Sequence, residues 1–352
     1  MSLRPSIVLP TRDRPDLCRD AVRSLLVART TGCEIIVVDQ SADDRTRLAL
    51  GALPDGLDPI TYIRSPRRSA SAARNEGCRV AAGEVFLFTD DDCVVDPDWG
   101  RAWCQELEHA PRVGIAFGTV RAPQPTRPTH DAGPGPPPPA MTPGVSFSFD
   151  PVRGYVAGFT PSVGEHGLEL FRRGPSWIGM GASMALRRDA WDTVGGFDEG
   201  LGAGTGLLAG EEVDLAYRVA RAGYRIGHYE LAPAWHHGFR AGATATAHIQ
   251  GYIAGTAALY AKHVRCGDGL AMWLLAAESW RYGRDVLRQT LRRSRPLGLR
   301  NLVAHVEGIR CSWTRPLDAG RRLYPPEDLA RPSPGPRPRI SSVEWQPGSE
   351  SP

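Results

Sequence analysis

The 352-residue chain has almost no lysine: of its 42 basic residues, Lys262 is the single lysine and the others are arginines. We attribute this bias to genome composition. The seven cysteines are odd in number and include no C-x-x-C pair, which argues for free thiols in a reducing compartment and against a zinc site. Cys18, Cys33, Cys78 and Cys93 are expected to be small, buried fillers.

Long apolar stretches are also missing. Residues 270–277 form the longest one near the C-terminus, far short of the roughly 20 residues that a membrane-spanning helix requires. Residues 1–10 lack the pattern of a signal peptide, so we expect a soluble, cytoplasmic protein. The 41% hydrophobic and 23% charged residues exclude disorder throughout, and the length allows one large domain or two modest ones.

The first hundred residues alternate between short apolar runs and helical spacing. Two helices are expected at residues 16–29 and 69–82, and four buried strands at 6–9 (stopped by Pro10), 34–38, 60–63 and 85–89. This alternation predicts an α/β fold with a mostly parallel central sheet flanked by helices. Ligands bind at the carboxyl ends of such strands, which is where polar residues cluster, at Thr11–Asp13, Asp39 and Asp90–Asp92.

Composition divides the chain into three parts. Residues 1–245 are expected to form the main domain, interrupted at 122–144 by a mobile surface loop with nine prolines that is either a tolerated insertion or a lid. Residues 246–324 are expected to be helical and basic, with 13 Lys or Arg against five Asp or Glu from residue 251 onward. Residues 325–352, rich in Pro, Ser and Gly, are expected to be a disordered tail.

The basic C-terminal region has a broad apolar face with arginines among it. The apolar members are Leu270, Trp273, Leu274, Ala277, Trp280, Leu287 and Leu291, and the arginines are Arg281, Arg284, Arg288 and Arg292. Such a face packs on the main domain as a helical cap, forms a homodimer interface, or rests peripherally on anionic lipid.

Asp90, Asp91 and Asp92 follow an apolar strand, so three carboxylates gather at the rim of the sheet. Like charges this close are unfavourable unless a cation neutralises them, and Mg²⁺ or Mn²⁺ binds carboxylates together with substrate phosphates. The alternative is a solvated acidic turn or a helix cap. The triplet is therefore a candidate divalent-cation site.

Arginines surround the start of the helix that begins SASAARN. Arg67, Arg68 and Arg74, with Asn75, could bind phosphate there, or form a surface cluster in an arginine-rich chain. Asp39, at a strand end, could accept hydrogen bonds from a nucleobase or cap the following turn.

Glu211 and Glu212 open another predicted helix. A carboxylate pair there can act as general base, although acidic residues are common at helix starts. His236 and His237 follow a strand-like segment at 225–229. A neutral imidazole facing the carboxylates would complete a metal site, whereas a structural or surface histidine pair is the commoner explanation.

In order along residues 4–240, the chain contains SIVLPTRDRPD, IIVVDQS, SAARNEG, FTDDDCVVDPDW, GASMALRRDAW with GGFDEGLG, GEEVDLAYRVARAGYRI and a late histidine. This series resembles a family 2 glycosyltransferase of the GT-A fold. The resemblance implies inverting transfer of one sugar from a nucleotide-diphosphate sugar to an acceptor hydroxyl or amine, assisted by Mn²⁺ or Mg²⁺.

The resemblance also implies residue roles by position. Asp92 would bind the metal with His236 or His237. The sugar and acceptor pocket would include Trp177, Gly179 and Gly181, and the nucleotide-sugar would contact Pro10, Thr11, Arg12, Asp39, Arg68, Arg74, Asp90 and Asp91.

Glu212 stands where the family usually has an aspartate base, one methylene shorter, which leaves Glu211 and Asp214 as competitors for this role. In the implied mechanism the metal and Arg74 neutralise the diphosphate while Glu212 removes the acceptor proton.

Two alternatives belong to other classes. A sugar-phosphate nucleotidyltransferase would have a glycine-rich loop with a lysine after the first strand, and PTRDRPD offers neither. The other is a non-catalytic sugar- or nucleotide-binding module; nucleic-acid binding is not expected, because no aromatic-interleaved recognition motif accompanies the basic region. A processive synthase would show Q-x-x-R-W and spanning helices, whereas residues 289–293 are QTLRR. The acceptor could be a small molecule, a peptide or a lipid-linked glycan.

Overall fold

The computed structural model describes residues 3–54, 56, 60–123, 143–150, 154–240, 242–292 and 297–325. Most of the predicted loop at 122–144 and of the predicted tail at 325–352 lies outside these residues. Among the described helices, none is both long and apolar enough to cross a bilayer.

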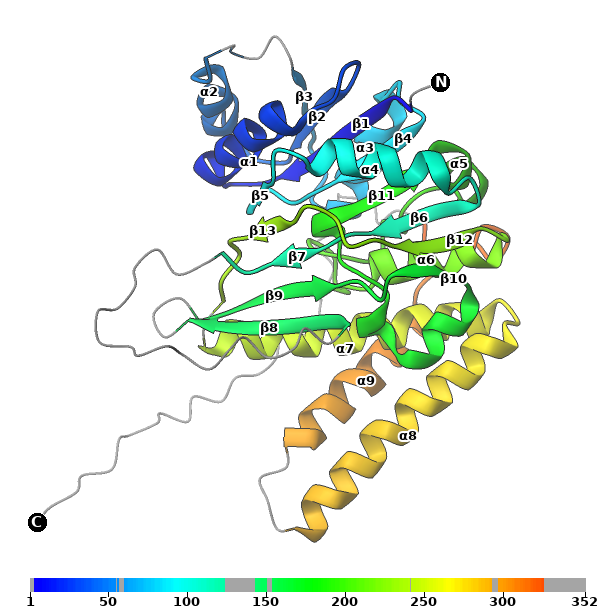
Figure 1. Cartoon of the computed structure of the whole chain (residues 1–352). Coiled ribbons are helices and arrows are strands. Elements are labelled where there is room, and N and C mark those ends of the chain that lie inside the picture. The colour runs from blue at the N-terminus through cyan, green and yellow to red at the C-terminus, as the bar shows by residue number, and fades with distance from the viewer. Residues whose placement is uncertain are drawn as a thin grey trace, which may run out of the picture.

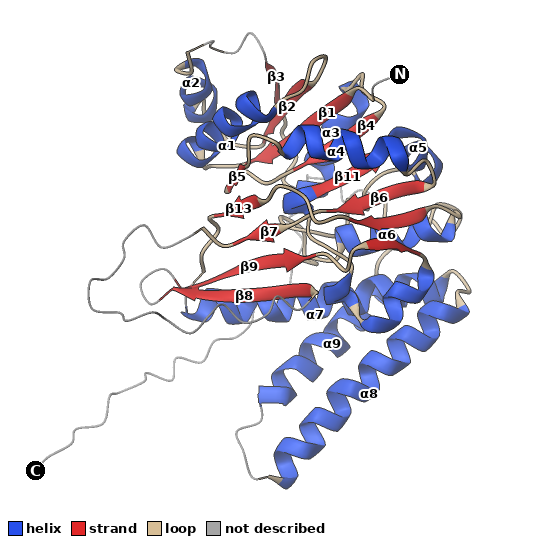
Figure 2. Ribbon diagram, in the orientation of Figure 1, coloured by secondary structure: helices blue, strands red, loops and turns tan. Residues whose placement is uncertain are grey.

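An eight-stranded, mostly parallel sheet forms the centre of the molecule, as the sequence predicts (Figures 1 and 2). The first four strands, β1, β2, β3 and β4, all run parallel to one another, and β6 runs parallel to β12. In contrast, β11 is antiparallel to both of its neighbours, β4 and β6. The strand order is β10 (Gly164–His166), β12 (Arg225–His228), β6 (Val113–Phe117), β11 (Met184–Arg187), β4 (Val85–Phe88), β1 (Pro5–Thr11), β2 (Glu34–Asp39) and β3 (Ile60–Arg64).

Side chains that alternate along the strands give this sheet two buried apolar faces. In β1, Val8 packs on one face, and Ile7 and Leu9 pack on the other. The first face is covered by α3 (Ala70–Val80), α5 (Arg188–Val194) and α6 (Glu211–Arg221); the second is covered by α1 (Pro15–Ala28), α4 (Trp99–His109) and, beside α1, α2 (Arg45–Gly51).

β1 continues through the predicted stop at Pro10 and ends at Thr11. Pro10 pairs with Val38 of β2, whereas β4 pairs only as far as Val8. Beyond Val8 the strand therefore has one paired neighbour, and proline is tolerated at such an edge because it has no N–H to donate. The other predicted strands and helices of the first hundred residues agree with the structure to within two residues at each end.

A second, five-stranded sheet was not expected from the sequence, because several of its strands have only two or three residues. β13 lies between β5 and β7, and its register places His236 opposite Cys93, the residue that follows the aspartate triplet. This sheet therefore brings the late histidine to the triplet. Its strand order is β5 (Cys93–Val95), β13 (Ala234–His236), β7 (Val120–Arg121), β9 (Gly154–Thr160) and β8 (Gly144–Asp150).

The C-terminal region is helical, but it starts earlier and ends earlier than predicted. Residues 315–324 are not helical and fold back through a bridge between Asp318 and Leu323, since Pro316 and Gly320 interrupt the helical pattern. The long helices are α7 (Gly242–Arg265), α8 (Gly269–Leu291) and α9 (Leu297–Thr314), and short 3₁₀ turns lie at Leu168–Arg173, Pro175–Trp177 and Gly181–Ser183.

The single lysine of the chain joins α7 to α6. Lys262 is fully buried, and its Nζ lies 2.6 Å from Asp198 Oδ2 and 2.6 Å from Asp214 Oδ1. Asp214 also accepts hydrogen bonds from Arg218 Nε at 2.8 Å and contacts His263 Nε2 at 2.9 Å. Although burial opposes it, the charges of Lys262 and Arg218 hold the pKa of Asp214 far below its usual range. A compact ammonium group fits between two buried carboxylates where a wider guanidinium would need more room.

Lys262→Met is expected to lower the free energy of unfolding by about 3–5 kcal/mol, because it removes the buried cation that Asp198 and Asp214 share. Chemical denaturation followed by circular dichroism measures this loss. The control is Arg101→Met, which removes an exposed arginine 2.8 Å from Asp98 and is expected to change stability little. Equal effects of the two substitutions would contradict the structural role of Lys262.

Candidate functional site

A cleft of about 1130 Å³ opens where the carboxyl ends of β1 and β4 meet the start of α6 and the helices α7 and α8. Gly255 of α7 allows a close approach, since a Cβ there would lie 2.1 Å from the Ala209 carbonyl oxygen, just before α6. Most of the predicted site residues line this cleft, namely Pro10, Thr11, Arg12, Arg68, Arg74, Asp90, Asp91, Asp92, Gly179, Gly181, Glu211, Glu212 and His236.

Arg74, on α3, connects the aspartate triplet to the glutamate pair. Its side chain is only 3% exposed, and its Nη2 donates to Asp90 Oδ1 at 2.9 Å. Its Nη1 lies 3.3 Å from Glu211 Oε1 and 3.6 Å from Glu212 Oε1. Burial opposes charge on the guanidinium, but the three carboxylates raise the pKa of Arg74 above its usual range. The cleft therefore contains a permanent, buried positive charge.

A turn between β4 and β5 points the other two aspartates toward β1. The Cys93 N–H donates to the Asp90 carbonyl oxygen at 3.1 Å and closes this turn. Thr11 Oγ1 donates to Asp91 Oδ2 at 2.9 Å, and Arg14 Nη1 lies 3.0 Å from both Asp91 Oδ1 and Asp92 Oδ2. Burial raises the pKa of Asp91 to about 6 against the opposing charge of Arg14. The two neighbouring carboxylates thus share one half-exposed arginine.

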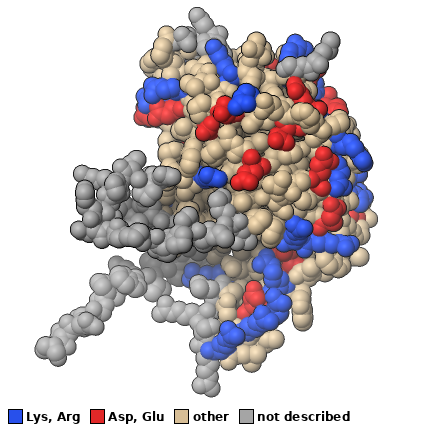
Figure 3. Space-filling view, in the orientation of Figure 1, with Lys and Arg blue, Asp and Glu red and all other residues tan. Residues whose placement is uncertain are grey.

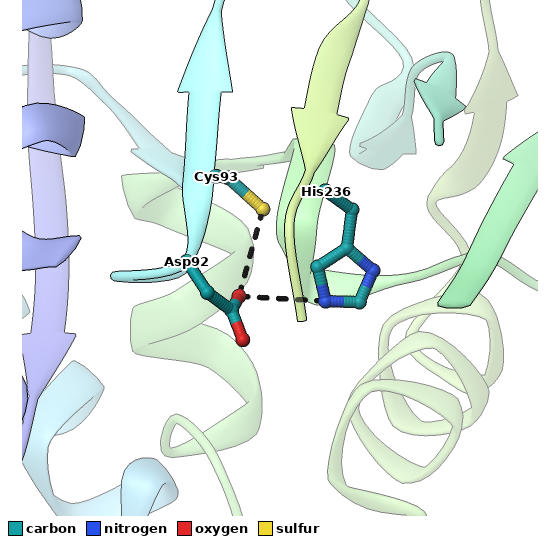
Figure 4. A group of neighbouring side chains, drawn as sticks. All are labelled: Asp92, Cys93 and His236. Carbon is teal, nitrogen blue, oxygen red and sulfur yellow. Dashed lines mark hydrogen bonds and ion pairs between the residues drawn. The ribbon is translucent and has the colours of Figure 1, made fainter. Parts of the chain in front are cut away.

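His236 faces Asp92, with its tautomer set by the backbone (Figure 4). His236 Nδ1 lies 2.8 Å from the Ala157 carbonyl oxygen, which only accepts, so Nδ1 carries a proton. Nε2 then points to Asp92 Oδ1 at 3.4 Å. Burial would raise the pKa of Asp92, but His236 and Arg14 bring it down to about 2.

In the neutral imidazole the Nε2 lone pair would face a carboxylate oxygen, so a proton or a cation is needed between them. Asp92 Oδ is a hard donor that suits Mn²⁺ or Mg²⁺, and His236 Nε2 is a borderline donor that fits Mn²⁺ better than Mg²⁺. Cys93 completes the group of potential ligand atoms, which all lie within 4.8 Å of one another. Burial raises the pKa of the Cys93 thiol well above its usual value, and its soft sulfur is a poor ligand for Mn²⁺ or Mg²⁺.

The two glutamates at the start of α6 differ in environment. Glu211 is buried, and among the described residues its Oε2 has no hydrogen-bond partner. The Glu212 side chain is 17% exposed and faces the cleft. A Cβ on Gly181 would lie 2.6 Å from Glu212 Oε1 and 2.7 Å from Arg74 Nη2, so a larger residue there would displace the ends of these two side chains. Glu212 is therefore the more accessible carboxylate.

Burial, and then the charge of Glu212, raise the pKa of Glu211 from 4.5 to about 8, against the charge of Arg74. The folded state thus keeps a proton that the unfolded state releases, so this contribution to stability is full below about pH 4.5 and is lost as the pH rises toward 8. In calorimetry, the melting temperature of Glu211→Gln is expected to fall less than that of the wild type between about pH 5 and pH 8. The exposed Glu106→Gln control should keep the wild-type slope, and parallel curves for all three proteins would contradict the assignment.

Three predicted residues do not line the cleft. Asp39 is fully buried, and its carboxylate accepts from the Ser41 N–H at 2.8 Å and from the Tyr62 hydroxyl at 2.6 Å. The side chain of His237 is exposed, and the backbone N–H of this residue donates to the Asp92 carbonyl oxygen at 2.7 Å. Trp177 packs on the apolar core. Asp214 is fully buried in the Lys262 cluster and is no candidate for a base.

Sequence reasoning missed four residues of this region. Arg14 lies in the PTRDRPD motif. Its partners Asp91 and Asp92 are far away in the sequence, so only the fold reveals this contact. Tyr62, on β3, gave no signal as the partner of Asp39. Arg240 and Tyr252 line the cleft from the β13–α7 connection and from α7. Their order in the sequence relative to the triplet carries no information about this proximity.

Comparisons with known proteins identify the fold and the family. A solved mannosyltransferase from Pyrobaculum calidifontis, in complex with GDP-Man and Mn²⁺, superposes with a TM-score of 0.53 at 17% identity, covering 91% of this chain and 78% of its own. The likeness shows the same fold. The fold is that of the GT-A glycosyltransferases, as predicted. The model of glycosyl transferase family 2 matches residues 6–192, and the chain belongs to that family.

The curated relatives are much longer than the region that they share with this chain. The O-antigen biosynthesis protein RfbC of Myxococcus xanthus is 28% identical over 238 residues, which are 63% of this chain and 16% of that protein. The GalNAc(5)-diNAcBac-PP-undecaprenol beta-1,3-glucosyltransferase of Campylobacter jejuni is 30% identical over 89 residues, covering 25% of this chain and 29% of its own. This chain thus spans less than a third of either relative.

Proposed function

We propose that the protein transfers a single sugar from a nucleoside-diphosphate sugar to an acceptor hydroxyl or amine, with inversion at the anomeric carbon and with the aid of Mn²⁺ or Mg²⁺. The observation that carries this proposal is the contact of Arg74 with both Asp90 and the Glu211–Glu212 pair. It unites, in one cleft, groups for binding a diphosphate and a carboxylate for activating an acceptor.

Asp92 and His236 would hold the cation, since their facing oxygen and nitrogen need a positive charge between them. When bound, the cation would neutralise the diphosphate as the bond to the sugar breaks. The solved mannosyltransferase, which contains Mn²⁺ and GDP-Man, supports a donor and metal of this kind. The structure favours His236 over His237 for this role because only His236 lines the cleft.

Glu212 is the proposed general base. It lines the cleft, and it lies beside Arg74 without being fully buried. Glu211, with its pKa raised to about 8, holds a proton near neutral pH and would orient Arg74 instead. Arg74 is preorganised by its contacts with Asp90, Glu211 and Glu212 to stabilise negative charge on the leaving diphosphate. Attack by the acceptor from the face opposite this group inverts the configuration.

Two observations support single transfer over the alternatives. Gln289 of the QTLRR segment accepts from the Gly298 N–H at 2.8 Å within the C-terminal helices and does not line the cleft. The only lysine of the chain is buried at Lys262, away from the cleft, so no lysine can bind a triphosphate as nucleotidyltransfer would require. The name of the Campylobacter jejuni relative indicates a lipid-linked acceptor, which is one candidate class here.

The test is hydrolysis of a panel of UDP-, GDP- and dTDP-sugars by the purified protein, with Mn²⁺ or with EDTA. We expect one nucleotide class to be hydrolysed in the presence of Mn²⁺, and its nucleoside diphosphate to raise the melting temperature when the metal is present. Indifference to every nucleotide would support a non-catalytic module. Protection by a nucleoside triphosphate with a sugar phosphate would instead support nucleotidyltransfer.

A further inference from the structure

Helices α8 and α9 form a hairpin that extends away from the two sheets (Figures 1 and 2). Their facing sides are packed: Ser279 Oγ lies 2.8 Å from His305 Nε2, and Leu274 is buried. α9 also packs tightly on α7, since a Cβ on Gly308 would lie 2.1 Å from the Ala254 carbonyl oxygen. The inner side of the hairpin is therefore fully used by the fold.

The outer side of the hairpin is apolar and exposed. Trp280 is 71% exposed, Leu287 59% and Leu291 75%. With Trp273 they recur at a spacing that places them on one stripe of α8. A row of exposed apolar side chains on one side of a helix indicates an interaction site. The exposed set is Met272, Trp273, Trp280, Leu287 and Leu291 on α8 and Leu299, Val303, Val306 and Trp313 on α9.

Arginines border this stripe toward the end of the hairpin. Arg284, Arg288 and Arg292 recur every four residues on α8, and Arg300 lies near the start of α9. Residues 286–306 contain no Asp or Glu. Within the described part of the chain, Arg288, Arg292 and Arg300 form no ion pair. Figure 3 shows basic side chains on the part of the surface formed by α8.

We propose that the α8–α9 hairpin docks on an anionic lipid bilayer, and that the cleft takes an acceptor carried on a lipid of that bilayer. Exposed Trp and Leu enter the interfacial layer, while unpaired arginines contact the lipid phosphates. Each arginine near such a surface adds attraction that salt weakens. The acceptor part rests on the proposed function, whereas the docking part does not.

A second copy of the chain is a poorer occupant for this surface. A two-fold dimer places the same patch on both partners, so one interface would contain two sets of Arg288, Arg292 and Arg300, whose positive charges repel one another. No carboxylate between residues 286 and 306 is present to offset that repulsion. A bilayer that contains anionic lipid matches both the apolar and the basic parts of the surface.

The cleft reaches the base of the same hairpin. From the aspartate triplet and Glu212 its wall continues along α7 to Trp273, Leu274, Ala277, Arg281 and Tyr282 of α8. Trp273 both lines the cleft and is 52% exposed on the outer stripe. An acceptor whose lipid stays in the bilayer could therefore extend its polar end along α8 to the proposed general base, Glu212.

Docking is tested by sedimentation of the full chain with vesicles of phosphatidylcholine alone or mixed with phosphatidylglycerol. We expect binding only to the mixed vesicles, weakened by salt. The double variants Leu287→Ser with Leu291→Ser, and Arg288→Glu with Arg292→Glu, are each expected to weaken that binding at least about tenfold. The matched control, Val27→Ser with Leu48→Ser, alters side chains that are 65% and 71% exposed on other helices and should bind normally.

Other outcomes overturn the docking. Equal binding to both kinds of vesicle would show that the arginines do not contribute. A dimer in light scattering that dissociates in the Leu287→Ser, Leu291→Ser variant would assign the surface to a second copy. Binding that is unchanged in both hairpin variants would place the membrane contact elsewhere.

The acceptor class is tested with radiolabelled sugar nucleotide and vesicles made from a bacterial total lipid extract. We expect label in the organic phase with the wild type and at least about tenfold less with the Leu287→Ser, Leu291→Ser variant, while hydrolysis of the donor in solution stays the same. Label that remains in water would overturn the lipid-carried acceptor. If the wild type binds vesicles but hydrolyses no sugar nucleotide, this result would contradict the proposed function and leave the docking intact.

Discussion

Asp92→Asn is expected to lower turnover of the sugar nucleotide about 10³-fold or more, because the cation would lose its anionic ligand beside the leaving diphosphate. The pKa of Asp92 is held at about 2, so the native side chain is charged at every working pH and asparagine cannot replace that charge. Steady-state hydrolysis with Mn²⁺ measures the effect. The increase in melting temperature caused by Mn²⁺ and nucleoside diphosphate should disappear together with activity.

Asp91→Asn is the matched control for this substitution. Asp91 lies next in the chain, is similarly buried and shares Arg14, but its pKa is already raised to about 6. The loss of turnover in Asp91→Asn is expected to be much smaller than the loss in Asp92→Asn. Circular dichroism should show that both variants fold. Metal-dependent turnover of Asp92→Asn within tenfold of the wild type would refute the assignment of the cation to this carboxylate.

Glu212→Gln is expected to lower kcat by about 10²–10⁴-fold, with little change in donor affinity, because glutamine cannot accept the acceptor proton. The carboxylate lies 3.6 Å from Arg74, so the amide can still occupy the same space beside Gly181. Single-turnover rates separate the chemical step from binding, and nucleotide-dependent thermal stabilisation reports binding directly.

Glu211→Gln decides between the two neighbouring carboxylates. Glu211 contacts Arg74 at 3.3 Å but holds a proton up to about pH 8, so its amide variant should change kcat much less and affect donor affinity instead. If the large loss of kcat appears in Glu211→Gln and not in Glu212→Gln, the base lies one residue earlier in the chain.

Much of the fold could be predicted because the signals were local. An apolar run such as Glu34–Val38 indicates a buried strand by itself, and in the structure this strand is only one residue longer. The second sheet could not be predicted, since strands such as Val120–Arg121 carry no periodicity of their own. They form because neighbouring strands provide their hydrogen-bond partners, which is a property of the tertiary structure.

The candidate site shows the same limit. The carboxyl ends of β1 and β4 place Thr11 and Asp91 together, and this proximity follows from the parallel topology alone. The choice between His236 and His237 did not follow, because it depends on the β13 register that sets which side chain faces Asp92. The burial difference between Glu211 and Glu212 likewise depends on how α7 packs beside them.

The cleft is lined by widely separated stretches of the chain: Arg74 and the aspartate triplet come from the first hundred residues, and another wall comes from α7 and α8. Changes at Tyr252, Trp273 or Tyr282 can therefore reshape one wall without altering the proposed diphosphate-binding residues. Gene duplication followed by drift in these helices would diversify acceptors at constant donor chemistry. Directed evolution toward new glycosides can likewise begin with α7 and α8. Lys262 of α7 should be kept, because it pairs with the buried Asp198 and Asp214.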